Sequence, residues 1–175
     1  MLVTAFDPRS PRAAECGLPL VDEMLRSEAR TDLQQRIIVG LAWAGRAKVE
    51  FRPEQAFVLY AIALESLLAK HGGRAGVTTR VPLRAAQLLG GPREHRRKVH
   101  ARTERLYDLR NAIVHSGHAA DLQTADVEDM QDLVNLALTS MLLHPPYLKF
   151  RSVREFDEWL DDQRLGGPSA KERGA

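Results

Sequence analysis

PEQAFVLYAIALESLLAK, residues 53–70, decides the fold class of this 175-residue chain. Its apolar side chains recur three or four residues apart, which is the period of an α-helix with one buried face. They are Phe57, Tyr60, Leu64, Leu67 and Leu68. Pro53 suits a first helical turn, because the amide hydrogen that proline lacks has no partner inside a helix there. We therefore expect a helix from Pro53 to about Lys70, ended by the glycines that follow.

The same period continues on both sides of this segment. It predicts long helices at 33–47, 93–115 and 124–143, a short helix at 82–89, and a last helix opened by a capping box of Ser152 and Glu155. No stretch alternates apolar and polar residues as a strand does. The predicted fold class is therefore all-α, an antiparallel up-and-down helical bundle with short extra helices.

This pattern also suggests a division of the chain. The expected parts are an N-terminal arm at 1–30, the bundle at 31–145, a C-terminal helix at 146–165 and a disordered tail at 166–175. The glycine-rich stretch 72–79 reads as a loop. It lacks the lysine and hydroxyl of a phosphate-binding P-loop, so we expect no nucleotide there.

The composition limits the class of protein and the cellular compartment that we expect. The chain is 44% hydrophobic with a formal charge of +2, which is ordinary for a globular domain. No apolar run approaches the roughly 18–20 residues that span a bilayer, and the N-terminus does not read as a signal peptide. The single cysteine, Cys16, cannot form an internal disulfide. We expect a cytoplasmic protein without a membrane partner.

The stretch LYDLRNAIVHSG, residues 106–117, carries the candidate catalytic residues Arg110, Asn111 and His115. They stand where the helical pattern gives way to Ser116 and Gly117. An Arg-x4-His spacing alone is weak evidence, since chance supplies it about once in a chain of this composition. A structural interpretation is equally specific: a histidine is favoured at a helix C-terminus, and Arg110 could pair with Glu65.

Positive charge gathers just before this motif. Between residues 93 and 110 there are seven basic and three acidic residues. Taken alone, such a run is typical of a solvated helix face with ion pairs four residues apart. If the helix contacts RNA, the contacting residues are expected to be Arg96, Arg97, Lys98, Arg102 and Arg105.

Three blocks in order resemble the HEPN superfamily, and within it the Apea-like HEPN group. They are ALESLLAK at 63–70, RVPLRAAQLLG at 80–90 and LYDLRNAIVHSG at 106–117, and IVGLAWAGRA at 38–47 fits the helix that usually precedes them. The resemblance spans about residues 33–145. It implies an α-helical bundle that commonly dimerises and, in many members, a ribonuclease that needs no metal or other cofactor. Its arginine and histidine would be Arg110 and His115. Many other members are non-catalytic, and relatives often act as toxins or in phage defence.

Helix geometry adds a reason for a dimer. Five residues advance a side chain by about 140° and about 7.5 Å, so Arg110 and His115 diverge, whereas Asn111 and His115 share a face. Two chains related by a dyad near this helix end could gather two arginines and two histidines around one cleft.

The supporting residues Glu65 and Tyr107 each have two possible roles. Glu65 could be a structural partner of Arg110 or an orienting group, and we favour the first. Tyr107 could reach a phosphate, but an aromatic at helical spacing is more often core. A metal site made of His115, His118 and Asp121 is disfavoured, because Ser116 and Gly117 break the helix between them.

Two functions remain open. The first is a dimeric, metal-independent endoribonuclease. The second is a non-catalytic HEPN module that binds RNA or a partner protein through the same helix. A short chain without a sensor domain also makes a regulatory partner protein plausible.

Overall fold

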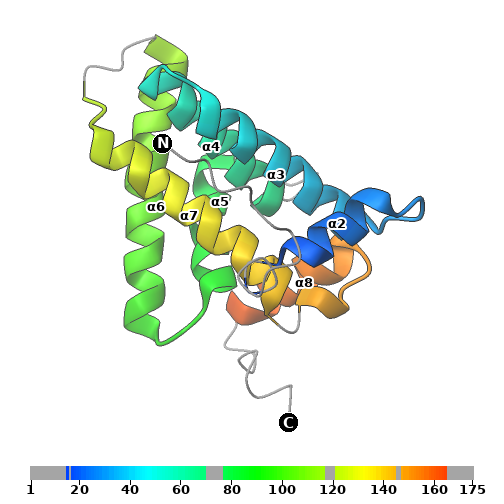
Figure 1. Ribbon diagram of the computed structural model, residues 1–175. Helices are drawn as coiled ribbons and strands as arrows, with labels where there is room; N and C mark the ends of the chain where they lie inside the picture. The colour runs from blue at the N-terminus through cyan, green and yellow to red at the C-terminus, as the bar shows by residue number, and fades with distance from the viewer. Residues whose placement is uncertain (1–14, 16, 70–76, 117–120, 145–146, 165–175) are drawn as a thin grey trace.

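The computed structural model describes residues 15, 17–69, 77–116, 121–144 and 147–164, and every regular element within them is helical (Figure 1). The α-helices are α2 (Leu18–Arg26), α3 (Asp32–Val49), α4 (Pro53–Leu68), α5 (Val77–Leu89), α6 (Arg93–Ser116), α7 (Thr124–Leu143) and α8 (Val153–Arg164), and a 3₁₀ turn, η1, spans Tyr147–Lys149. The predicted all-α helical bundle is confirmed.

Helix α4 lies at the centre of the bundle and contacts α3, α5, α6 and α7. It pairs with α3 as an antiparallel hairpin, and α5 pairs with α6 in the same way (Figure 1). The apolar positions that predicted α4 are its buried face, since Phe57, Leu64, Leu67 and Leu68 are fully buried. Burying each such side chain stabilises the fold by about 1.5–3 kcal/mol, so α4 organises the core.

Local chemistry sets the helix ends. At the start of α3, the Gln34 amide donates to Thr31 Oγ1 at 3.2 Å and the Thr31 amide donates to Gln34 Oε1 at 2.9 Å, which is a capping box. At the turn between α5 and α6, Gly90 and Gly91 have φ angles of 61° and 87°. Only glycine adopts this left-handed conformation without strain, so the pair ends α5 sharply.

Two helices differ from the expectation. Helix α2 lies inside the predicted N-terminal arm, because Pro19, read from sequence as a breaker, occupies its first turn, where proline is tolerated. Helix α5 begins at Val77 rather than Pro82, so the predicted loop was wrong over 77–79. Val81 and Pro82 are buried, and their packing offsets the hydrogen bond that an internal proline removes.

Other expectations fall on parts of the chain outside the described residues. These are 1–14 of the arm, Cys16, the glycines 72–76, and the tail 166–175. The capping box predicted for the last helix is present in altered form. The Glu155 amide donates to Ser152 Oγ at 3.2 Å, but the Glu155 carboxylate accepts from the Arg151 amide at 2.9 Å.

A buried charge cluster attaches α8 to the bundle. Asp157 of α8 accepts from Arg84 of α5 and lies 3.6 Å from Arg36 of α3. All three side chains are at most 10% exposed. Burial lowers the pKa of Arg36, Asp157 opposes this, and the charge of Arg84 adds to it. Because two arginines share this carboxylate, removing Asp157 would leave two buried cations facing each other.

Two glycines of α3 give a matched test of this packing. A Cβ at Gly40 would lie 2.6 Å from Leu67 Cδ2, and Leu67 is fully buried, whereas a Cβ at Gly45 would meet nothing within 4 Å. Gly40→Ala should lower the free energy of unfolding by about 1–2 kcal/mol through overpacking. Gly45→Ala should raise it by about 0.5–1 kcal/mol, because alanine favours a helix. Urea denaturation measures both, and equal shifts in the two variants would contradict the α3–α4 packing.

Candidate functional site

Arg110 connects α6 to α4. Its Nη2 atom lies 3.1 Å from Glu65 Oε1, and the two side chains are 22% and 19% exposed. Its Nη1 atom donates to Asn111 Oδ1 at 3.3 Å. The ion pair that the sequence made possible is therefore present, and it fixes the arginine at the edge of the interface between the two helices.

The pair is held by charge more than by hydrogen bonds. Arg110 Nε and Glu65 Oε1 are both buried and make no hydrogen bond among the described residues. A bidentate arginine–carboxylate pair would satisfy such atoms, and its absence leaves the guanidinium less tightly committed to Glu65. Burial raises the pKa of Glu65, while the positive charge of Arg110 opposes that rise.

Tyr107 lies beneath this pair. Its side chain is fully buried, and its hydroxyl donates to the Ala61 carbonyl at 3.4 Å. Burial raises the pKa of Tyr107 well above its ordinary value, and the nearby negative charge of Glu65 raises it further. The phenol is therefore neutral and faces protein, so it positions α6 against α4.

His115 is exposed in the last turn of α6, which continues as an α-helix through Ser116. Helical geometry turns it about 140° from Arg110. The arginine contacts α4, whereas the histidine faces solvent, so one copy of the chain does not bring them to one point. Asn111, partly buried, lies on the His115 side of the helix and contacts Arg110.

The middle of α6 is tied to α7. Arg102 Nε donates to Asp129 Oδ1 at 2.6 Å, and Arg102 Nη2 donates to the Asp129 carbonyl at 2.9 Å. Arg105 donates to Asp126 Oδ1 at 2.5 Å and to Asp129 Oδ2 at 3.0 Å. Two of the five basic residues considered for RNA contact therefore fasten α6 to its neighbour.

Sequence reasoning missed these partners. Charge counting along one helix sees only residues three or four apart, and Asp126 and Asp129 belong to a different helix. One signal was available. The arginines are three residues apart, as are the aspartates, so each pair occupies one face of its helix and the two faces can meet.

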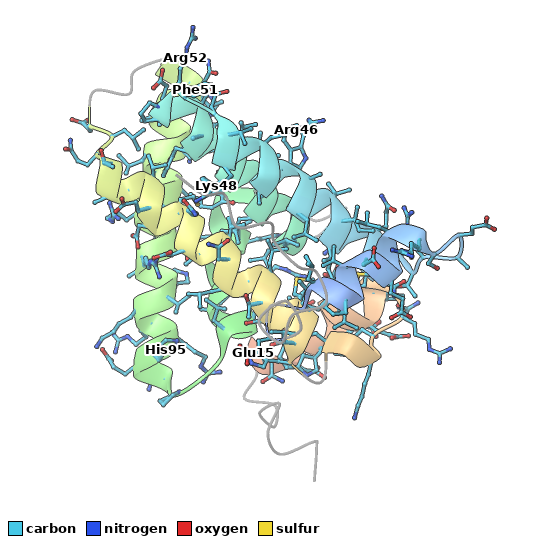
Figure 2. The ribbon with its side chains drawn as sticks, viewed as in Figure 1. Glu15, Arg46, Lys48, Phe51, Arg52 and His95 are labelled. Atoms are coloured by element: carbon cyan, nitrogen blue, oxygen red, sulfur yellow. The ribbon has the colours of Figure 1, made fainter. Side chains whose placement is uncertain are left out.

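The first half of α6 is different. Arg97 and Lys98 are exposed and Arg96 is partly buried, and none of the three forms an ion pair with the described residues. Figure 2 shows exposed side chains along this part of α6, with His95 near its start. The available positive charge therefore lies about five turns before His115 on the same helix.

The residues considered for a metal do not form a cluster in the described part of the chain. No group of three or more histidine, cysteine, aspartate or glutamate side chains there could hold a metal ion. His118 lies outside the described residues, and Asp121 is exposed. In the same described part, no helix is long and apolar enough to cross a membrane.

Comparisons with protein-family models, curated proteins and solved structures found no match to this chain. The likeness to the HEPN superfamily therefore rests on the three sequence blocks and their order.

The α6–α7 contact makes a pH-dependent prediction. The hydrogen bond from Arg105 lowers the pKa of Asp126, burial opposes this, and the Gln123 amide adds to the lowering. Asp126 thus contributes stability above its unfolded pKa, about 3.9, and loses it as pH falls through the lower folded pKa. Asp126→Asn should cost about 1–2 kcal/mol at pH 7, and the difference from wild type should vanish near pH 2.

Urea denaturation as a function of pH measures this difference. Asp132→Asn is the matched control, because Asp132 is an exposed aspartate of the same helix. It should change stability by less than about 0.5 kcal/mol. A deficit in Asp126→Asn that stays constant down to pH 2 would contradict the role given to the ionised carboxylate.

Proposed function

We propose that this chain is a HEPN-like, metal-independent endoribonuclease whose active site forms where two copies meet at the C-terminal end of α6. The observation that carries the proposal is the contrast along one helix. Arg110 is pre-positioned by Glu65 at a partly exposed edge, while His115 stands free in solvent five residues later. Both side chains that RNA cleavage needs are present, and neither is fully buried in the core.

A second copy supplies what one copy lacks. A two-fold axis near His115 would bring two histidines and two arginines around one phosphate. Two arginines facing each other across the axis repel when the cleft is empty, which favours binding of an anion.

RNA suits this cleft because it carries its own nucleophile. One His115 accepts the proton of the 2′-hydroxyl, and the 2′-oxygen attacks the adjacent phosphorus. The bond from phosphorus to the 5′-oxygen breaks as the other His115 donates a proton to that oxygen. Arg110 stabilises the negative charge that develops on the phosphate oxygens. The products are a 2′,3′-cyclic phosphate and a 5′-hydroxyl.

A second candidate is a non-catalytic module that binds RNA or a partner protein. The observation in its favour is that Arg110 is already engaged by Glu65, while Arg97 and Lys98 lie exposed without acidic partners among the described residues. Binding would then use the first half of α6 without turnover. Both candidates accommodate a regulatory partner and the toxin or phage-defence setting that the resemblance implies.

His115→Ala separates the two candidates. It removes the general base and the general acid together, so RNA cleavage should fall by at least about 10²-fold. Folding should survive, because a histidine at a helix C-terminus contributes only about 0.3–1 kcal/mol. Cleavage of mixed RNA by the wild-type protein, measured by gel electrophoresis, should persist in EDTA, leave cyclic phosphate ends and spare DNA.

His144→Ala is the matched control, since His144 is also an exposed histidine at a helix C-terminus, that of α7. It should retain wild-type cleavage. If the wild-type protein and His115→Ala bind RNA equally and neither cleaves it, the enzyme is excluded and the binding module is favoured.

A separate variant tests whether RNA contacts the first half of α6. The double variant Arg97→Ala, Lys98→Ala should weaken binding of single-stranded RNA. Each lost phosphate contact should also lower the slope of log affinity against log salt by about 0.7. Arg102→Ala should instead lower the free energy of unfolding, because Arg102 holds Asp129. Fluorescence anisotropy at several salt concentrations measures the slope, and an unchanged slope in the double variant would exclude this half of α6 from the contact.

A further inference from the structure

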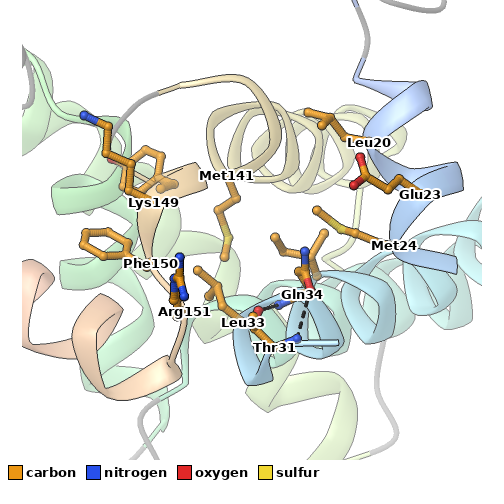
Figure 3. Close-up of a pocket in the computed structure, with 12 residues that line it drawn as sticks. Leu20, Glu23, Met24, Thr31, Leu33, Gln34, Met141, Lys149, Phe150 and Arg151 are labelled. Atoms are coloured by element: carbon orange, nitrogen blue, oxygen red, sulfur yellow. Dashed lines mark hydrogen bonds between the residues drawn. The ribbon is translucent and has the colours of Figure 1, made fainter. Parts of the chain in front are cut away.

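A pocket of about 510 Å³ lies at the other end of the molecule from His115, between α2, α3, the end of α7 and the segment 147–151 (Figure 3). Its volume is within the range of about 300–1,000 Å³ that holds small molecules in proteins. None of the residues considered for RNA cleavage lines it. It is therefore a separate candidate site.

The floor of this pocket is apolar. It is formed by the buried side chains of Met24, Leu33, Ile37 and Met141, with Leu20 and Phe150 partly buried at its sides. Methionine fills irregular space and adapts its shape, so two methionines in one wall accommodate an apolar guest of variable form. The floor offers no charged group to a ligand.

The rim is charged and asymmetric. Lys149 and Arg151 line one side, across the pocket from Leu20 and Glu23, and Figure 3 shows the Lys149 ammonium pointing away from the pocket and from Arg151. Both cations are exposed, and neither forms an ion pair within the described residues. Glu23 is the only acidic residue among those that line the pocket.

The start of α3 adds to the positive side. Thr31 and Gln34 line the pocket, and their capping box satisfies the Thr31 hydroxyl oxygen and the Gln34 carbonyl oxygen (Figure 3). These oxygens are therefore engaged, whereas the N-terminal end of the helix carries a partial positive charge. Asp32, in the first turn of α3, offsets part of this charge, so the side of the rim that favours a negative head group is the one at Arg151.

We propose that this pocket binds a small amphipathic anion, with a carboxylate or phosphate head at Arg151, on the side opposite Glu23, and a medium-length apolar tail on the methionine floor. The tail removes apolar surface from water, and the head makes charge-assisted hydrogen bonds at the rim. A neutral molecule of the same length would leave Arg151 unpaired. A short anion would leave the floor empty.

Isothermal titration of the full chain tests this with four probes below their micellar concentrations: octanoate, octyl phosphate, octanol and acetate. One molecule of octanoate or octyl phosphate should bind per chain, and the tighter of the two identifies the head group. Octanol should bind about tenfold or more weakly, because it lacks the charge. Acetate should give no heat, because it lacks the tail.

Variants test whether the anion binds in this pocket. The double variant Lys149→Ala, Arg151→Ala should weaken the better anion about tenfold while leaving octanol within about twofold. Arg154→Ala, which removes an exposed cation of α8 that does not line the pocket, should change neither. Leu20→Trp should abolish binding by filling the space from its partly exposed side.

The proposal is overturned if neither anion binds, or if octanol binds as tightly as the anions. It is also overturned if several molecules bind per chain without sensitivity to Leu20→Trp. Circular dichroism of each variant confirms that the helices remain, so a loss of binding cannot be mistaken for unfolding.

Discussion

The ion pair of Glu65 and Arg110 is the contact on which the candidate site depends. It crosses from α4, the central helix, to α6, and Tyr107 packs beneath it with its hydroxyl on the Ala61 carbonyl. Both charged side chains are mostly buried, so the contact holds the guanidinium beside the carboxylate. A phosphate that uses Arg110 must share it with Glu65. Burial raises the pKa of Glu65, and the charge of Arg110 opposes that rise.

The charged residues of α6 have three different roles. Its first half presents Arg97 and Lys98 to solvent, its middle binds α7 through Arg102 and Arg105, and its end carries Arg110 and His115. This order explains why a basic run need not be a basic surface. The arginines of the middle section fix α6 against α7, and this contact determines how the exposed cations and His115 are presented relative to the rest of the bundle.

Much of the fold could be predicted from sequence because the spacing of apolar residues and the helix-breaking glycines and prolines are local signals. Helices α4 and α7 were predicted within two residues at either end, and Gly90 and Gly91 marked the turn before α6. Helix α2 was missed because Pro19 read as a breaker, although a first helical turn tolerates proline. The start of α5 was missed because Pro82 read as a helix start, although it lies buried inside the helix. The partners of Arg102, Arg105 and Asp157 were missed because pairing between helices depends on their packing, which no single segment encodes. Pairing with Arg110 was predicted as one of two roles for Glu65. Both residues lie in the ordered sequence blocks that resemble the HEPN superfamily.

In the proposed ribonuclease, cleavage requires two copies of the chain around one site. The most direct test follows RNA cleavage per chain as the protein is diluted and follows the mass of the particle by light scattering over the same concentrations. Cleavage per chain should fall as the dimer dissociates, with both curves sharing one midpoint. A monomer that cleaves RNA with undiminished activity at every concentration would contradict it.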